Sequence, residues 1–307
     1  MSATLPMALA ATAIDLDTPR RAQEGLLDQL ARDRAALAIA VAPSGALSVH
    51  GGGRVIAPLA GRRPLAYLGR VENRPLVLVD GPEAARQAPS ATLADPYAAG
   101  STGEERSGIE VVGLRECGLR LTPVDATFAA VAVALRQWHE ETRCVRCAAS
   151  QDLREAGWVY RCPHCGAERY PRTDPCIIVA VTDEVDRLLL ARAAHFPAGR
   201  FSVLAGYVEP GESLEAAVRR EVWEEAGVRV HSVRYRGSQP WPFPRSLMCA
   251  FTARVHGTPT PRVDGVEIAE AAFYSRTEVT DLIERGQMRL PSGISVARSL
   301  VADWQNG

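Results

Sequence analysis

Acidic residues at a regular spacing make one segment of this sequence the best candidate for chemistry. The segment GYVEPGESLEAAVRREVWEEAGV, Gly206 to Val228, has an Ala-, Glu- and Arg-rich centre that predicts a helix ending at a glycine. At about 100° per residue, three carboxylates fall on the side of its apolar residues: Glu221, Glu224 and Glu225. Carboxylates on an inward face are costly unless they are paired or bind a cation. Two interpretations stay open: a divalent metal site, or a surface helix whose acids pair with Arg219 and Arg220.

Two Cys-x-x-Cys pairs form a second candidate site. CVRC begins at Cys144, CPHC ends at Cys165, and fourteen residues separate the two pairs. Four thiolates at this spacing suit the tetrahedral coordination of Zn²⁺. Because such a site leaves no open coordination position, we expect a structural zinc with four ligands: Cys144, Cys147, Cys162 and Cys165. Disulfides are the alternative, and they are disfavoured in a cytosolic chain.

Composition excludes several other kinds of chemistry. The 307 residues suffice for two domains, and all 35 basic residues are arginine, which excludes Schiff-base lysines and the P-loop lysine. The net charge of −1 argues against a protein that coats nucleic acid. No apolar run reaches the length of a membrane span, and no basic residue precedes the short apolar stretch near the N-terminus. We therefore expect a cytoplasmic protein without a membrane partner.

The elements that must position these residues can be read from the hydrophobic pattern. Strands are expected at Pro175–Val181, Arg187–Ala193 and Ser246–Val255, and a long apolar helix at Val124–Glu141. The turn-rich segment Pro89–Gly108 is expected to be a loop. The pattern indicates an α+β fold with the acidic helix packed on a sheet. We divide the chain into an N-terminal domain (1–141), a zinc ribbon (142–171) and a catalytic domain (172–307).

The acidic segment contains every fixed position of a known motif. Gly206, Glu212, Arg220-Glu221, Glu224-Glu225 and Gly227 follow the spacing of the Nudix box, so the C-terminal domain resembles the Nudix hydrolases. The resemblance implies an α/β/α sandwich that hydrolyses nucleoside diphosphates linked to another group. It implies that Glu221, Glu224 and Glu225 bind Mg²⁺ or Mn²⁺, with support from Glu212. Arg220 would orient a glutamate through a charge-assisted hydrogen bond.

A second motif narrows the expected substrate. SQPWPFPRS, Ser238 to Ser246, is similar to the signature of the NADH pyrophosphatases within the Nudix family, and the order of the three domains also matches. The resemblance implies cleavage of NADH or NAD⁺ into NMNH or NMN and AMP, and removal of a 5′ NAD cap from RNA. It also implies a homodimer with aromatic residues supplied across the interface.

The same resemblance suggests further site residues. Substrate-binding positions are expected at Tyr207, Tyr170, Gln239, Trp241, Phe243 and Ser246. Glu267 is the expected late metal ligand, and Glu270 competes for that role. Two alternatives remain: a Nudix hydrolase for ADP-ribose or another nucleoside diphosphate, and a zinc-ribbon nucleic-acid-binding protein with an inert Nudix fold.

Overall fold

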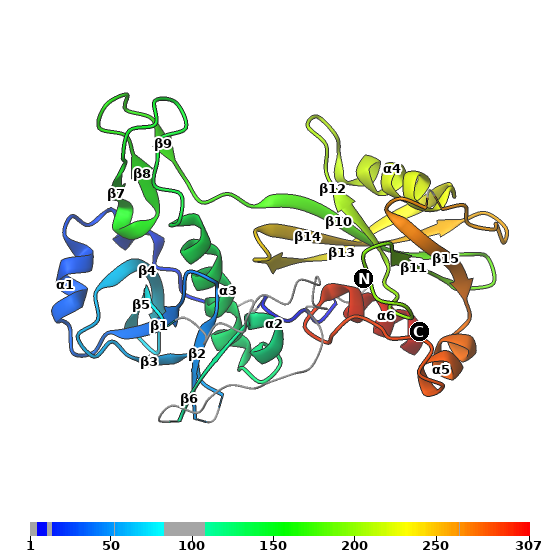
Figure 1. The fold of residues 1–307 in the computed structure, drawn as a ribbon, viewed down its shortest axis with the longest axis horizontal. Coiled ribbons are helices and arrows are strands. Elements are labelled where there is room, and N and C mark those ends of the chain that lie inside the picture. The colour runs from blue at the N-terminus through cyan, green and yellow to red at the C-terminus, as the bar shows by residue number, and fades with distance from the viewer. Residues whose placement is uncertain (1–4, 11–13, 52, 83–107, 264) are drawn as a thin grey trace.

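The computed structural model describes residues 5–10, 14–51, 53–82, 108–263 and 265–307. They form an N-terminal lobe, a small three-stranded ribbon and a C-terminal lobe, arranged along one long axis (Figure 1). The predicted loop Pro89–Gly108 lies, apart from Gly108, outside the described residues.

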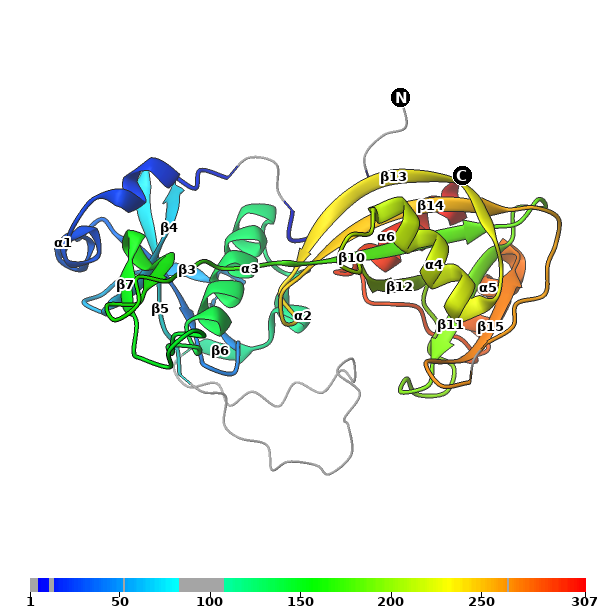
Figure 2. The same cartoon turned by 90° about the horizontal axis from the view of Figure 1, so that it is seen from above.

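The N-terminal lobe is built on a mixed six-stranded sheet. Its strands lie in the order β4–β5–β1–β2–β6, and β3 also pairs with β1. The strands are β1 Leu37–Val41, β2 Leu47–His50, β3 Ile56–Pro58, β4 Pro64–Val71, β5 Arg74–Asp80 and β6 Ile109–Val112. Helix α3 (Pro123–Trp138) packs on one face and α1 (Leu26–Arg32) on the other, so the sheet separates two apolar cores (Figure 2). A short helix, α2 (Leu114–Cys117), precedes α3.

The C-terminal lobe has a second mixed six-stranded sheet. Its strands lie in the order β13–β14–β10–β11–β15, and β12 also pairs with β10. The strands are β10 Asp174–Thr182, β11 Leu188–Ala193, β12 Leu204–Tyr207, β13 Val230–Trp241, β14 Ser246–Val255 and β15 Ile268–Tyr274. Helix α4 (Leu214–Ala226) covers one face, and α6 (Val296–Asn306) packs on the other, close to α5 (Arg276–Glu284) (Figure 2).

The two sheets share one topology. In each, the first strand pairs antiparallel with the second and third strands and parallel with the fifth. The fifth strand then pairs with the fourth, and the second with the sixth, both antiparallel. The lobes differ between the third and fourth strands: residues 59–63 join β3 to β4 without a helix, whereas β12 and β13 enclose α4.

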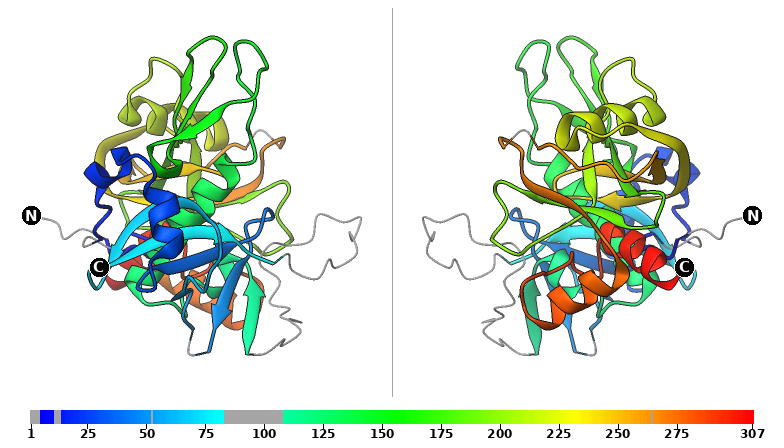
Figure 3. Two further views of the ribbon diagram at one scale, coloured as in Figure 1. Left: turned by 90° about the vertical axis from the view of Figure 1, so that its left-hand side faces the viewer. Right: turned by 90° about the vertical axis from the view of Figure 1, so that its right-hand side faces the viewer.

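The ribbon is attached to the N-terminal lobe. It consists of β7 (Asp152–Arg154), β8 (Val159–Arg161) and β9 (Glu168–Arg169), with a single turn of 3-10 helix at Glu155–Gly157. A Cβ added to Gly157 would lie 2.5 Å from the Cα of Ala66, and Trp158 Nε1 donates to the carbonyl of Tyr67 at 2.7 Å. The ribbon and α4 rise on the same side of the molecule (Figures 1 and 3).

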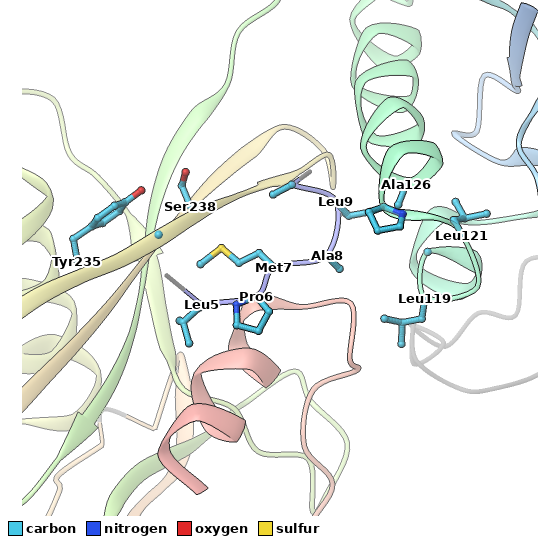
Figure 4. Close-up of a pocket in the computed structure, with 14 residues that line it drawn as sticks. Leu5, Pro6, Met7, Ala8, Leu9, Leu119, Leu121, Ala126, Tyr235 and Ser238 are labelled. Atoms are coloured by element: carbon cyan, nitrogen blue, oxygen red, sulfur yellow. The ribbon is translucent and has the colours of Figure 1, made fainter. Parts of the chain in front are cut away.

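The lobes meet where the β13–β14 hairpin reaches α2 and α3 (Figure 2). A segment near the N-terminus lies along this junction: Leu5 belongs to the core of the C-terminal lobe, and Leu9 belongs to that of the N-terminal lobe. Beside this segment is an apolar groove of about 750 Å³, whose wall on the N-terminal side includes Leu119 and Leu121 (Figure 4).

The expected α+β class is confirmed, and the predicted elements correspond to observed ones. The three predicted strands are β10, β11 and β14, and the predicted apolar helix is α3. Within the part of the chain that the structure describes, no helix is long and apolar enough to cross a bilayer.

Candidate active site

Helix α4 presents two glutamates toward the sheet. The Ser213 side chain caps its first turn by accepting from the backbone N–H of Ala216, and Gly227 ends it with φ of 65°. Glu221 and Glu225 are each only 8% exposed, beside apolar residues of α4 that are fully buried. Glu224 differs from the prediction, because its side chain is 56% exposed. The inward face of α4 therefore carries two carboxylates, and the third lies at its edge.

Arg220 gathers the acids of the segment. Its guanidinium donates to both oxygens of Glu212, at 3.0 and 2.9 Å. It also donates to Oε1 of Glu221 at 2.8 Å, to Oε2 of Glu224 at 3.1 Å and to the carbonyl of Tyr207 at 2.8 Å. One guanidinium thus binds three carboxylates, which leaves an excess of negative charge. A cation that is coordinated by the remaining carboxylate oxygens would neutralise this charge. The predicted orienting role of Arg220 depends on its hydrogen bonds to Glu221 and Glu224.

Gly206 makes room for Glu221. A Cβ added at this glycine would lie only 1.9 Å from Cδ of Glu221. The first glycine of the motif is therefore required by a close approach between strand β12 and a carboxylate, and any side chain there would displace that carboxylate. The sequence offered the glycine but no indication of this contact.

Several pKa shifts reflect the negative charge that gathers around Glu221. Burial raises the pKa of Glu221, the Arg220 guanidinium opposes the shift, and the charges of Glu224 and Glu267 add to it. Burial, together with the charges of Glu221 and Glu225, raises the pKa of the Cys176 thiol to about 12. The hydrogen bond from Arg220 lowers the pKa of Glu212.

The two competing late glutamates have different surroundings. Glu270 is bound to Arg192, with Oε1 lying 2.7 Å from Nε and 2.6 Å from Nη2. Glu267 precedes β15, its carbonyl accepts from the backbone N–H of Ala194, and its charge acts on Glu221. Glu270 therefore has an arginine partner, whereas the charge of Glu267 acts on Glu221, and the assignment of the late metal ligand stays a prediction.

Gln239 does not have the surroundings of a substrate ligand. Its side chain is fully buried, and its Nε2 donates to the carbonyls of Ala8 at 2.6 Å and Ile294 at 2.8 Å. Its Oε1 accepts from the backbone N–H of Val296 at 2.8 Å. These bonds tie β13 to the N-terminal segment and to α6. Gln239 therefore holds backbone groups of three segments together in this structure, and its expected contact with substrate stays a prediction.

The two predicted aromatic platforms also have protein partners. Trp241 and Phe243 meet edge to face, with ring centroids 4.9 Å apart, and both pack against the core of the N-terminal lobe. The Arg115 guanidinium lies over Phe243 at 4.2 Å and over Trp241 at 5.5 Å. These rings contribute to the junction between the lobes, and their expected stacking on a nucleobase stays a prediction.

The remaining predicted substrate residues lie in two places. Tyr207 is 55% exposed beside Gly206, and its hydroxyl lies 3.2 Å from that of Ser246, which is buried. Tyr170 is 58% exposed at the base of the ribbon, where its hydroxyl donates to Glu168 at 2.6 Å. It borders a hollow of about 620 Å³ together with Arg154 and Trp158. Tyr207 and Ser246 are thus adjacent to the acidic helix, and Tyr170 belongs to the ribbon.

The four cysteines form a compact cluster. All seven cysteines of the chain are free thiols, which excludes the disulfide alternative. The measured Sγ–Sγ separations are 3.5 Å (Cys147–Cys162), 3.6 Å (Cys144–Cys165) and 3.7 Å (Cys147–Cys165). Tetrahedral Zn²⁺ with bonds of about 2.3 Å requires sulfur separations of roughly 3.8 Å. Backbone N–H groups, first that of Arg146, lower the pKa of Cys144 to about 6.

The two candidate metal sites differ in preorganisation. Among the described residues, the four cysteines are the one group of three or more potential ligands whose donor atoms all lie within 4.8 Å. The glutamates are more loosely arranged and are bridged by Arg220. The cysteine cluster could bind zinc as it stands, whereas the acids fit a hard, oxygen-ligated cation by their charge and burial.

Comparison with known proteins first defines the class. Residues 172–292 match the model of the NUDIX domain, and residues 29–138 match the NADH pyrophosphatase-like rudimentary NUDIX domain. The C-terminal lobe is therefore a Nudix domain, and the shared topology of the two sheets agrees with the second match.

The relatives then define the particular family. The NAD-capped RNA hydrolase NudC of Deinococcus radiodurans is 38% identical over 249 residues, which cover 80% of this chain and 78% of that protein. The protein of the same name from Mycobacterium tuberculosis H37Rv is 42% identical, over 64% of this chain and 65% of its own length. A crystal structure of a Nudix hydrolase from Nitrosomonas europaea covers 49% of this chain and 97% of its own, at 22% identity and a TM-score of 0.38. The chain belongs to the NudC-type NADH pyrophosphatase family of Nudix hydrolases.

Proposed function

We propose that this protein is a metal-dependent hydrolase of the pyrophosphate bond in NADH and NAD⁺, giving NMNH or NMN and AMP. It would also remove a 5′ NAD cap from RNA. The observation that carries the proposal is the burial of Glu221 and Glu225 on the inward face of α4, with Gly206 making room for one of them. Family membership and the names of its relatives support this substrate class.

The proposed roles follow from the contacts. Glu221 and Glu225, with Glu224 at the rim and Glu267 opposite, would hold one or more Mg²⁺ or Mn²⁺ ions. A bound ion supplies charge neutralisation for the diphosphate and lowers the pKa of attacking water. Arg220 holds Glu221 and Glu224 in place, and Glu212 fixes Arg220. Removing one of these acids should therefore affect catalysis far more than stability.

Substrate recognition is proposed at the exposed ring beside the acids. Tyr207 offers a flat face, and its hydroxyl is fixed by Ser246. Tyr170, which is exposed on the ribbon, would supply a second ring, either within the chain or across the interface of the proposed homodimer. A solution mass of twice the 33.1 kDa of one chain, measured by light scattering, tests the dimer.

Two further assignments belong to the same proposal. The cysteine cluster would hold a structural Zn²⁺, because its four sulfurs leave no position for substrate. We also propose the division into 1–141, 142–171 and 172–307, with residues 5–7 packing in addition on the C-terminal lobe.

A substrate panel tests the function. Purified protein is incubated with equal concentrations of NADH, NAD⁺, NAD-capped RNA and ADP-ribose, each with Mg²⁺, with Mn²⁺ and with a chelator, and products are identified by mass. We expect NMNH or NMN plus AMP from the dinucleotides and loss of activity with chelator. ADP-ribose is included because Gln239, Trp241 and Phe243 make contacts within the protein, which leaves less of the signature for direct recognition. Turnover of ADP-ribose alone would replace the proposal with that alternative.

A further inference from the structure

The N-terminal lobe has the sheet of a Nudix domain but no helix between its third and fourth strands. None of the predicted metal ligands lies in it, so its contribution must come from what it touches. The part facing the C-terminal lobe is formed by α2 and α3 (Figure 2). Both contact Ser238–Ser246, the end of the β13–β14 hairpin with its turn, termed here the signature loop.

The N-terminal lobe holds the tip of the signature loop. Arg115 of α2 lies 4.2 Å above the ring of Phe243, which in turn meets Trp241. Gln137 of α3 donates from Nε2 to the carbonyl of Pro242 at 3.3 Å. These contacts join residues more than one hundred positions apart in the sequence, so the loop's conformation depends on both lobes.

The base of the same loop reaches the substrate side of the candidate active site. The backbone N–H of Asp174 donates to the carbonyl of Arg245 at 2.9 Å, and Arg245 Nε donates to the Asp174 carboxylate at 2.9 Å. The next residue, Ser246, lies 3.2 Å from the hydroxyl of Tyr207. Tyr207 in turn offers its carbonyl to Arg220 at 2.8 Å. These contacts, together with the chain between Phe243 and Ser246, therefore connect α2 to the arginine that binds the acids.

We propose that the N-terminal lobe is a buttress for substrate binding, with Arg115 as its main positioning residue. Arg115 holds the signature loop so that Ser246 and Tyr207 form a fixed wall beside the acids. The effects that we expect on KM rest on the proposed function, whereas those on amide exchange do not. It also accounts for the composition of the signature: prolines stiffen the loop and aromatic rings fill the junction, which holds Ser246 in its place in the binding wall.

The kinetic test is Arg115→Ala. Loss of the stacked guanidinium lets the loop leave its binding-competent position, so KM for NADH should rise about five- to tenfold. The value of kcat should change less than about twofold, since the acids on α4 are held by Arg220 and Gly206. Arg115→Lys should restore only part of the affinity, because an ammonium group cannot stack as a planar guanidinium does.

A matched control lies five residues along the same segment. Arg120 lies in the same lobe, but its guanidinium is bound to Glu110 through two hydrogen bonds, at 2.9 and 3.1 Å. Arg120→Ala removes the same charge from the same lobe and should leave KM unchanged. An equal rise in KM in both variants would overturn the positioning role in favour of a general loss of stability.

A double-mutant cycle tests whether Arg115 acts through the loop. Ser246→Ala removes the hydroxyl contact to Tyr207, and the double variant with Arg115→Ala should show a KM close to that of Ser246→Ala alone. Additive effects of the two substitutions would show that Arg115 acts elsewhere, and the contact path would then be rejected.

Hydrogen–deuterium exchange provides a readout that needs no activity. In Arg115→Ala, amide exchange should accelerate at residues 240–247 and 205–208 while the core of α4 stays protected. Acceleration confined to α2, or spread equally over both lobes, overturns the buttress even in a protein that hydrolyses NADH. Conversely, a wild-type protein inactive on every dinucleotide would refute the proposed function, and the exchange pattern would still decide this inference.

Discussion

The two sheets of this protein have the same strand order, yet only one carries the candidate site. Residues 208–229 link β12 to β13 and contain α4 with its glutamates, whereas residues 59–63 link β3 to β4. The sheet therefore supplies a frame in both lobes, and the chemistry depends on one connection between its third and fourth strands.

The faces of the two sheets show how the absence of that helix is compensated. In the C-terminal lobe, Val218 and Val222 of α4 pack on Ile177 and Val179 of β10. In the N-terminal lobe, α1 precedes the sheet and covers the corresponding face with Leu26 and Leu30, against small residues of β1. The helix that covers this face of the N-terminal lobe carries one acid, Asp28, and one arginine, Arg32, and it packs on the sheet through its leucines.

The largest expected effect is a loss of activity when a glutamate of α4 is changed, with no such loss for a glutamate of the other sheet. Glu225→Gln keeps the size of a buried side chain on α4 but removes its charge, so kcat/KM for NADH should fall about a thousandfold. Stability should hold or increase, because a buried negative charge is lost. Steady-state kinetics and denaturant unfolding measure the two quantities. The control is Glu110→Gln, on β6 of the other sheet, which should keep full activity. If Glu225→Gln keeps its activity within tenfold of the wild type, the proposed role of α4 is refuted.

The next largest effect concerns the ribbon on the N-terminal lobe. Cys147→Ser should remove about one zinc ion per chain and unfold the ribbon, since the binding energy of a structural zinc is folding energy. Because Trp158 and Gly157 pack on β4, the N-terminal lobe should also melt at lower temperature. Elemental analysis and calorimetry test this. Cys249→Ala, in the C-terminal lobe, should keep the zinc, and equal zinc loss in both variants would contradict the assignment.

A pair of tryptophans compares the junction with the outer surface of α4. Trp241→Ala opens a half-buried position between the lobes and should lower the free energy of unfolding by about 2 kcal/mol. Trp223 is 41% exposed and has the Arg229 guanidinium 4.2 Å from its ring centroid. Trp223→Ala should cost less than about 1 kcal/mol. Equal costs in urea unfolding would show that Trp241 does not hold the lobes together.

The last expected effect appears only in acid: the stability of the fold should depend on pH through a histidine at the end of α3. Burial, then the charges of Arg136 and Arg169, lowers the pKa of His139 to about 4. Below an ordinary value of about 6.5, the unfolded chain therefore binds a proton that the folded chain does not. Stability should decrease as pH falls from 6.5 to 4, by up to about 3 kcal/mol. His139→Gln should lose this slope in unfolding measured at several pH values, and an unchanged slope would assign it to other groups.

The sequence predicted α4 and its acids well because helix period, capping residues and motif spacing agree. It misplaced Glu224, since a side chain at the edge of an apolar stripe turns outward when Arg220 binds it there. It gave no indication that Gln239 bonds buried backbone groups, because a motif does not show which neighbours a polar side chain meets in the fold.

The topology of the N-terminal lobe could not be predicted from the sequence. Its strands are short, and β1, LAIAV, is buried on both faces, so alternation gives no register. The duplication is visible only in the pairing of strands far apart in sequence. Arg115 was missed likewise, because nothing near it in sequence marks the hairpin tip that it covers.

One consequence concerns dissection of the molecule. Leu5 is 5% exposed in the core built by β10 and α6, and the backbone N–H of Leu5 donates to the carbonyl of Arg236. In a fragment comprising residues 172–307, the site that Leu5 fills would be open to water. The hydrophobic core of the C-terminal lobe therefore includes a residue from the opposite end of the polypeptide. Supplying a short peptide that contains LPMAL in trans should raise the fragment's melting temperature.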